Sequence, residues 1–345
     1  MKKKAAELLI SADSHVIEPN DLWAERLPSS YRDRAPHWPK GSITHAHPGG
    51  TDPRARVKEM ATDGVSGEVL YPSLPLRQFG MTDAAFQEAC FRVYNDWLIE
   101  YCAYAPDRLF GVALISTYQI DNAVKELNRC KKAGMRGAMI WQIPPEEIAF
   151  TSDHYERFWA ACQDLQMPVS LHILTGIPYP PVDEVKDSRD PSWGLNRSVN
   201  MKLLYVTTAL TRIITSGVLE RYPKLKIVLV ENEVSWLPFV ISQWDKYCAR
   251  GIFDSQMTML PGEYVKRQVY ATFFNDPPSR WMFGDWGSDN CMWSNDYPHP
   301  NSTWPKSREV IARDLGHLPG ASRAKLLNKN VARLYDLPAI TSVAA

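Results

Sequence analysis

Four short apolar segments of this chain each lead into a side chain that can bind a metal ion. Each segment has the length and composition of a buried parallel strand. In a barrel of parallel strands, active sites lie at the C-terminal ends of the strands, which is where these side chains would stand. The segments and their terminal side chains are 8–15 with Asp13 and His15, 169–172 with His172, 227–231 with Glu231, and 291–296 with Asp296.

Apolar runs alternate with amphipathic helical patterns along the chain, and this alternation is typical of repeated β/α units. It predicts an α/β fold: a distorted (β/α)8 TIM barrel with long loop insertions, in a single domain over residues 1–345. A doubly wound open sheet is the alternative. The candidate strands lie at 8–16, 67–71, 109–115, 137–141, 169–173, 227–231, 269–274 and 291–295. The candidate helices lie at 55–63, 83–105, 121–132, 154–165, 199–220, 237–247, 308–314 and 324–335.

Two connections are too long for ordinary loops of such a barrel. A proline-rich polar segment at about 18–54 is predicted to be an N-terminal insertion over the end of the first strand. The loop at 175–195 is rich in Pro and Asp. We expect both segments to shape the pocket at the mouth of the barrel.

Composition excludes several classes of function. Lys+Arg and Asp+Glu are both 39, so no basic field is present to attract nucleic acid. No stretch approaches the roughly 18 apolar residues of a membrane span, and no standard secretion signal is visible at the N-terminus. The six cysteines show no C-x-x-C spacing and are interpreted as reduced thiols. These features predict a cytoplasmic protein that binds neither nucleic acid nor membrane.

Asp13 and His15 are two residues apart on the first predicted strand, so their side chains face the same side and can reach one ion. Alone, the pair could also be a turn aspartate beside a surface histidine. His172 stands at the end of an apolar run, where it is either a metal ligand or a core histidine with satisfied hydrogen bonds.

Two carboxylates follow later apolar runs. Asp296 could cap a helix, but Pro298 and Pro300 argue against a helix at this point, and a buried carboxylate needs a partner. Glu231 is either a buried acid, base or ligand, or an exposed loop carboxylate like the neighbouring Glu233.

Five further side chains are candidates for substrate binding. Arg77 could bind a substrate carboxylate through two hydrogen bonds, or be a surface arginine. Trp141, Trp293 and Tyr297 could wall an aromatic pocket, or simply pack in the core. His299 could orient the substrate or a neighbouring carboxylate.

Five stretches of this chain resemble the amidohydrolase-2 group, which includes aminocarboxymuconate-semialdehyde decarboxylase and γ-resorcylate decarboxylase. The resemblance covers roughly residues 8–337 in order and implies a distorted TIM barrel, one divalent metal and a homodimer. The stretches are Ser-Ala-Asp-Ser-His-Val-Ile-Glu-Pro at 11–19, Leu-His at 171–172, Leu-Lys-Ile-Val-Leu-Val-Glu at 225–231 with Trp-Leu-Pro at 236–238, Ser-Asn-Asp-Tyr-Pro-His at 294–299, and 325–335.

By position, the resemblance makes His15, His172 and Asp296 metal ligands or, for Asp296, an acid beside the metal. Two positions depart from the pattern. Asp13 stands where many members have His or Glu. Glu231 stands where many members have a His that helps polarise water or substrate, which puts a hydrolytic mechanism in doubt.

The predicted cofactor is one divalent metal ion, Zn²⁺ or Mn²⁺, bound by Asp13, His15, His172 and Asp296. Two aspartates and two histidines suit Mn²⁺ or Fe²⁺ as well as Zn²⁺, whose structural sites favour Cys and His. Three or four protein ligands leave positions open for a substrate.

These residues predict a metal-dependent, non-oxidative decarboxylase of a small aromatic or unsaturated acid with an adjacent hydroxyl or oxo group. The metal would chelate the carboxylate and the neighbouring oxygen. The predicted catalytic residues are Asp296, which supplies a proton to the carbon losing CO₂, Glu231 as a proton relay, and the ligand His172. The alternative is a hydrolase of an amide, ester, lactone or C–C bond with a metal-activated water. A third hypothesis is a small-molecule binder on a decayed barrel.

Overall fold

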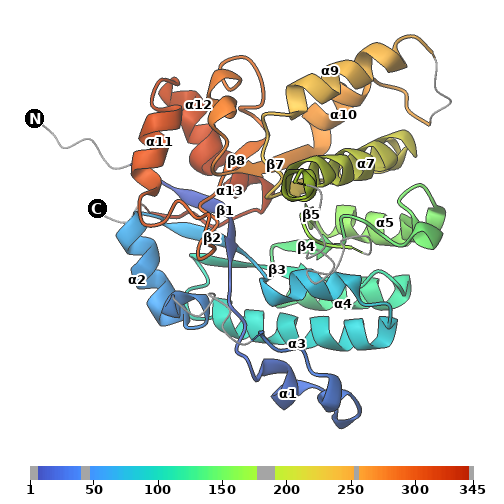
Figure 1. The fold of residues 1–345 in the computed structure, drawn as a ribbon, viewed down its shortest axis with the longest axis vertical. Helices are drawn as coiled ribbons and strands as arrows, with labels where there is room; N and C mark the ends of the chain where they lie inside the picture. The colour runs from blue at the N-terminus through green and yellow to red at the C-terminus, as the bar shows by residue number, and fades with distance from the viewer. Residues whose placement is uncertain (1–6, 40–46, 177–190, 252–255, 342–345) are drawn as a thin grey trace, which may run out of the picture.

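The computed structural model describes residues 7–39, 47–176, 191–251 and 256–341. Eight parallel strands follow one another around a barrel in the order of the chain, and helices surround them (Figure 1). This order confirms the predicted TIM barrel and excludes the doubly wound sheet, in which the strand order reverses. The strands are β1 Ile10–His15, β2 Gly67–Tyr71, β3 Leu109–Leu114, β4 Gly137–Ile140, β5 Val169–His172, β6 Ile227–Val230, β7 Val269–Phe273 and β8 Cys291–Trp293.

The barrel is nearly closed by the segment that follows β8. Two backbone hydrogen bonds join this segment to β1: His15 N donates to Tyr297 O at 2.6 Å, and Asp296 N donates to Asp13 O at 3.1 Å. Behind them, Ser11 and Ser14 of β1 bond the side chain of Asn295. This closure places the residues after β8 directly beside the C-terminal end of β1.

Each predicted helical segment is helical in the structure, but one is divided, one contains a π-helical turn, and four helices were not predicted. The predicted helix at 199–220 is divided into α7 and α8, because Gly217 between them has a left-handed backbone with φ 75°. Helix α10 and the short helices α1, α6 and α12 were not predicted. The α-helices are α1 Leu22–Arg26, α2 Pro53–Asp63, α3 Ala84–Cys102, α4 Ile120–Lys132, α5 Glu156–Asp164, α6 Trp193–Leu195, α7 Met201–Thr215, α8 Val218–Arg221, α9 Leu237–Cys248, α10 Pro261–Gln268, α11 Ser307–Leu315, α12 Gly320–Ala324 and α13 Asn330–Leu334. Short 3-10 or π-helical turns are η1 Ser29–Arg34, η3 Pro48–Gly50, η4 Leu74–Gly80, η5 Glu146–Ile148, η6 Asp153–Tyr155, η8 Asn196–Asn200, η9 Pro277–Trp281 and η10 Lys325–Lys329.

Helix α3 shows how the sequence specifies these elements. The Asp83 side chain caps its first turn by accepting a hydrogen bond from Phe86 N at 3.1 Å. Its apolar residues recur at helical spacing and are buried against the barrel, and the helix ends before Pro106.

The segment at 18–54 begins outside the barrel. Its first helix, α1, packs against α3, where Trp23 Nε1 donates to Cys90 O at 3.0 Å. Its end returns to β1, since Ile17 N donates to Gly50 O at 2.8 Å. Residues 40–46 of this segment and 177–190 of the second long loop lie outside the described residues.

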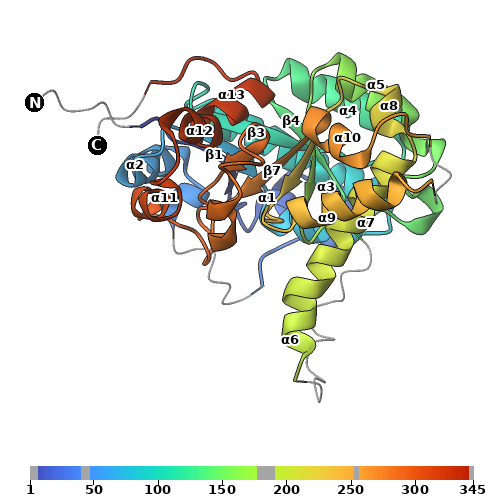
Figure 2. The same ribbon diagram turned by 90° about the horizontal axis from the view of Figure 1, so that it is seen from above.

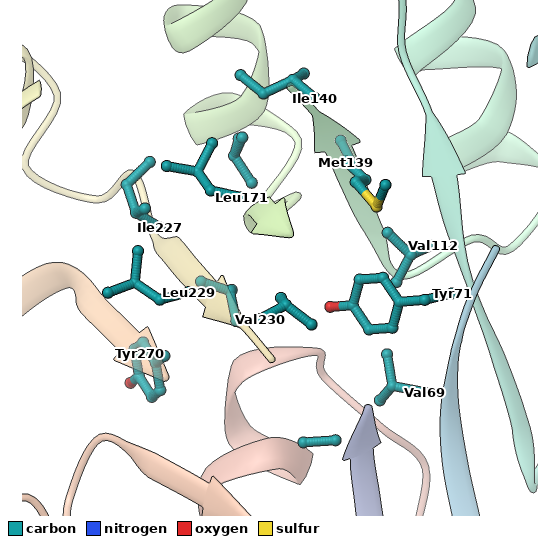
Figure 3. Packing of buried hydrophobic residues seen from close by; sticks show 14 of the residues in the cluster. Val69, Tyr71, Val112, Met139, Ile140, Leu171, Ile227, Leu229, Val230 and Tyr270 are labelled. Carbon is teal, nitrogen blue, oxygen red and sulfur yellow. The ribbon is translucent and has the colours of Figure 1, made fainter. Parts of the chain in front are cut away.

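The barrel interior forms the floor of the C-terminal mouth. Figure 3 shows the Tyr71 ring directed into the barrel toward Val112, Met139 and Val230, while Leu171 points toward the surrounding helices. The Tyr71 hydroxyl bonds Ser170 Oγ and Tyr335 OH, each at 2.9 Å. Packed side chains therefore close the barrel below its C-terminal mouth.

None of the helices in the described part of the chain combines the length and apolar composition needed to cross a membrane.

Candidate metal centre

The structure brings the five predicted acid and imidazole groups together at the C-terminal mouth. Asp13 and His15 come from β1, His172 from β5, Glu231 from the residue after β6, and Asp296 from the segment after β8. His15 Nε2 lies 3.4 Å from Asp13 Oδ1 and 3.5 Å from Asp296 Oδ1. His172 Nε2 lies 3.5 Å from Glu231 Oε2 and 4.0 Å from Asp13 Oδ1. The two aspartates and both histidines are fully buried or within 1 % of it.

Two of these residues adopt a backbone conformation that is rare outside glycine. Glu231 has φ 57° and Asp296 has φ 53°, both in the left-handed region. The strain, about 1 to 3 kcal/mol per residue in general, persists only where the surroundings fix it. Here Glu231 N donates to Thr272 Oγ1 at 2.9 Å and Asp296 N donates to Asp13 O. Such strain is concentrated at functional sites, which favours a functional role for both carboxylates.

Hydrogen bonds to main-chain carbonyls fix the tautomer of both histidines. His15 Nδ1 lies 2.6 Å from Pro72 O, and His172 Nδ1 lies 2.9 Å from Ile173 O. Because a carbonyl oxygen only accepts, each Nδ1 carries the hydrogen and each Nε2 presents a lone pair. This is the arrangement in which proteins orient metal-binding histidines.

A cation fits the cluster, because its buried atoms are acceptors that lack a donor. The six acceptor atoms without a hydrogen-bond partner among the described residues are Asp13 Oδ1 and Oδ2, His15 Nε2, His172 Nε2, and Asp296 Oδ1 and Oδ2. Buried polar atoms are rarely left unpaired. Carboxylate oxygens and imidazole nitrogens are also the donor set of transition-metal sites.

The electrostatics of the protein alone leave the cluster short of positive charge. Desolvation raises the pKa of Asp13, and desolvation and the neighbouring carboxylates raise the pKa of Glu231 and Asp296 well above the usual range. Desolvation also lowers the pKa of His15 well below its usual value and that of His172 to about 3. A bound divalent cation would oppose the upward pKa shift of the carboxylates, since it stabilises their charged forms.

His299, predicted to orient either the substrate or a neighbouring carboxylate, contacts a carboxylate. Its Nδ1 lies 2.9 Å from Asp296 Oδ1, and its ring stacks on His15 with 3.9 Å between centroids. Its Nε2 lies 3.2 Å from Ser73 Oγ, whose only hydrogen is donated to Val16 O at 2.7 Å. His299 Nε2 is therefore the donor to Ser73.

The contact between Asp296 and His299 is a close approach and not a hydrogen bond, since both Asp296 oxygens are without a hydrogen-bond partner among the described residues. With Nε2 protonated, a neutral His299 has a lone pair on Nδ1, which is therefore an acceptor beside the carboxyl group. A proton on either group, or a cation shared by both, would relieve the repulsion between the two acceptors. Desolvation lowers the pKa of His299 and raises that of Asp296, which favours the proton on Asp296 in the protein without a cation.

Three residues near the cluster were missed by the sequence analysis as site residues. The Tyr71 ring centroid lies 5.7 Å from that of His172 and forms the floor. Glu233 has φ 53°, and desolvation and Asp276 raise its pKa to about 8. Only the Glu-x-Glu spacing could have indicated Glu233.

Lys202 on α7 is the third residue, and it is half-buried. Desolvation sets the pKa of Glu231 and Asp296 above normal, while the positive charge of Lys202 opposes this shift at both carboxyls. Lys202 is thus a cationic group close enough to act on the cluster, and its position in a helix gave no sequence signal.

The next two predicted substrate-binding residues lie in η4 and in β8. Arg77 is exposed on η4. Trp293 is buried and lines a small cavity with Ile311 and Leu315 of α11, on the outer side of β8. Successive side chains of a strand point to opposite faces, so Met292 and Trp293 cannot both face the interior.

The other two predicted aromatic residues are buried in specific contacts. Trp141 Nε1 donates to Tyr155 OH at 2.9 Å. The Tyr297 ring lies under the Arg56 guanidinium at 4.5 Å, and its hydroxyl donates to Glu59. Substrate binding by these residues stays a prediction.

Comparison with known proteins gives relatives along most of the chain. The γ-resorcylate decarboxylase of Rhizobium sp. (strain MTP-10005) is 24% identical over 308 residues, which cover 82% of this chain and 86% of that protein.

Solved structures share the fold at lower identity. A 2,6-dihydroxybenzoate decarboxylase in complex with 2,6-dihydroxybenzoate superposes with a TM-score of 0.73 at 20% identity and covers 96% of this chain and 100% of that one. The 5-carboxyvanillate decarboxylase of Novosphingobium aromaticivorans, complexed with manganese and 4-hydroxy-3-methoxy-5-nitrobenzoic acid, has a TM-score of 0.74 at 17% identity and covers 96% and 97%. The family model described as Amidohydrolase matches residues 42–337. The chain therefore belongs to the amidohydrolase family.

Proposed function

We propose that this protein is a metal-dependent, non-oxidative decarboxylase of a small aromatic or unsaturated acid that carries a hydroxyl or oxo group beside its carboxylate. The observation that carries the proposal is the close pair Asp296 and His299, 2.9 Å apart, directly beside a cluster of acceptors that lack a donor among the described residues. Decarboxylation needs both parts: a cation to bind the acid, and a proton for the carbon that loses CO₂. Decarboxylases of hydroxybenzoates among the relatives support the substrate class.

The ion would be held by Asp13, His15, His172 and Asp296, with Glu231 near enough to join them. When bound, it supplies a Lewis acid that neutralises charge on the substrate. The oxygen-rich donor set suits Mn²⁺ better than Zn²⁺, whose structural sites favour Cys and His. The 5-carboxyvanillate decarboxylase also contains manganese. We favour Mn²⁺ over Zn²⁺ for these reasons.

The residues of the chain then manage the proton. Asp296 would carry it, with Oδ1 2.9 Å from His299 Nδ1. As the C–C bond to the carboxylate breaks, its electron pair stays on the substrate carbon, which takes the proton from Asp296 while CO₂ leaves. His299 returns a proton to Asp296, and Ser73 fixes the imidazole by accepting from Nε2. Glu231, with its raised pKa, is a second buried carboxyl group for the relay.

Hydrolysis is the second candidate, and the description of the family model as Amidohydrolase favours it. In that reaction Asp296 would take a proton from an attacking water instead of giving one to carbon. The two reactions differ in whether oxygen from water enters the product.

The test uses the full chain reconstituted with Mn²⁺ or Zn²⁺ and incubated with 2,6-dihydroxybenzoate, 5-carboxyvanillate and related acids in oxygen-18-labelled water. We expect CO₂ release and a product that lacks the carboxylate and contains no label. Labelled product from an amide, ester or lactone substrate, without CO₂, would establish the hydrolase. No turnover of any compound by metal-loaded protein would favour a binding protein.

We also propose a homodimer in the cytoplasm. The projecting arm formed by α6, η8 and the first turns of α7 supports the dimer (Figure 2). Its apolar side chains are unusually exposed: Leu195 by 72%, Val199 by 54% and Leu204 by 59%. Light scattering on the purified protein measures the mass. Six free cysteines are consistent with a reducing compartment.

A further inference from the structure

A single turn orients two imidazoles of the metal centre. It comprises Pro72 and Ser73, which follow β2, and Leu74, the first residue of η4. Pro72 O accepts the hydrogen of His15 Nδ1 at 2.6 Å, and Ser73 Oγ accepts from His299 Nε2 at 3.2 Å. A shift of this turn would therefore change the direction of both rings together.

One buried carboxylate from another part of the chain fixes this turn. Glu18 Oε1 accepts from Ser73 N at 3.0 Å, and Glu18 Oε2 accepts from Leu74 N at 3.0 Å. The two oxygens thus accept from consecutive amides. This geometry fixes the position of the turn, and not only its distance from Glu18. A third bond, from Ser73 Oγ to Val16 O at 2.7 Å, ties the turn to the end of β1.

Within the described part of the chain, Glu18 is buried without a counter-charge, which is unfavourable for a carboxylate whose only role is to pack. The residue is completely buried, and among the described residues no Lys, Arg or His forms an ion pair with it. Desolvation raises its pKa to about 7, although the two amides act in the opposite direction. Burying an acid without a counter-charge is costly, so the contacts it makes must justify its position.

We propose that Glu18 is a positioning residue of the metal centre, which fixes the orientation of His15 and His299 through the turn at 72–74 without touching ion or substrate. The proposal rests on the proposed metal centre and is independent of which reaction the centre performs. A residue that merely caps η4 would affect the stability of the protein but not the geometry of a bound metal ion. That difference can be measured.

The experiment compares metal-free wild type, Glu18→Gln and Glu18→Ala by titration with Co²⁺, whose visible absorption reports ligand geometry. Glutamine keeps the size of the side chain but presents its NH₂ group to one of the two amides. We expect Co²⁺ affinity to fall by about 10- to 100-fold, as for other groups that orient metal-binding histidines, with a changed Co²⁺ spectrum. Circular dichroism should show that the fold is retained.

Asp245→Asn is the matched control. Asp245 Oδ1 also accepts from a main-chain amide, Gly262 N at 2.7 Å, but it joins α9 to α10 in the outer layer (Figure 1). This variant should bind Co²⁺ with the affinity and spectrum of the wild type, whatever its melting temperature.

Three results would overturn the inference. Glu18→Gln could lose thermal stability but keep the wild-type affinity and spectrum, which would make Glu18 a structural cap. It could fail to fold where Asp245→Asn folds, which would give Glu18 a general folding role. Wild-type protein could bind no Co²⁺, and this outcome alone would also remove the metal centre on which the proposed function depends.

Discussion

His299 Nδ1 lies 2.9 Å from Asp296 Oδ1, while His299 Nε2 donates to Ser73. The imidazole also stacks on His15, so the pair lies at the edge of the metal centre. An acid in this place can protonate a substrate bound by the metal, and removing it should affect chemistry more than binding.

Replacement of His299 by Asn tests this role. We expect kcat to fall by about 100-fold or more, as is usual when a general acid–base group is lost, with a smaller change in KM. Steady-state kinetics with the acid identified in the substrate screen provide the measurement. His154→Asn is a control, because the His154 ring bonds Thr117 O and lies outside the cluster. A His299→Asn variant with wild-type kcat would contradict the proton relay.

Asp296→Asn separates acid chemistry from metal binding. The amide keeps one oxygen for the ion but cannot deliver a proton. We expect turnover to be abolished while much of the metal stays bound, as measured by elemental analysis and product formation on the same sample. Retained turnover would exclude Asp296 as the proton donor.

A buried ion pair contacts the end of β1 through a hydrogen bond to its main chain. Arg56 Nε lies 2.5 Å from Glu68 Oε2, and Arg56 Nη1 donates to His15 O at 2.6 Å. Arg56→Met would leave Glu68 charged and unpaired, which should lower the free energy of unfolding by about 3 to 5 kcal/mol. Urea denaturation measures this loss. The double variant Arg56→Met/Glu68→Gln should recover part of it, and a single variant as stable as wild type would refute the account of this pair.

Glu233 should make stability depend on pH in a defined direction. Its pKa rises from 4.5 to about 8 on folding, chiefly through desolvation, so the folded state binds a proton that the unfolded state releases. The contribution of Glu233 to the free energy of unfolding is fully present below pH 4.5 and is lost as pH rises toward 8.

The comparison with Glu233→Gln isolates this contribution in metal-free protein. The stability of wild type relative to the variant should decline across this window by at most about 1.4 kcal/mol per pH unit. Urea denaturation at several pH values supplies the measurement. A constant difference between the two proteins would show that Glu233 does not change its protonation on folding.

The sequence predicts the barrel and the members of the cluster for the same physical reason. Parallel strands buried on both faces appear as apolar runs, and the C-terminal end of each run marks the mouth. The place of His172 at the mouth could therefore be predicted without any tertiary information. Asp13 and His15 follow from the two-residue period of a strand.

Other features depend on contacts between distant segments, which periodicity does not reveal. The orientation of His299 beside Asp296 depends on Ser73, and the role of Glu18 depends on a turn more than fifty residues away. Trp293, in contrast, could have been placed from the sequence, because the two-residue period of β8 puts it on the outer face. Helix α10 was missed because its eight residues directly precede the stronger apolar pattern of β7.

The most direct test of the account is the metal content of protein purified without added metal, measured by elemental analysis beside His172→Ala. We predict about one equivalent of Mn or Zn per chain in the wild type, lost in His172→Ala and retained in His154→Ala. A wild-type protein without metal, even after soaking in Mn²⁺ and Zn²⁺, would contradict the metal centre and the decarboxylase proposed from it.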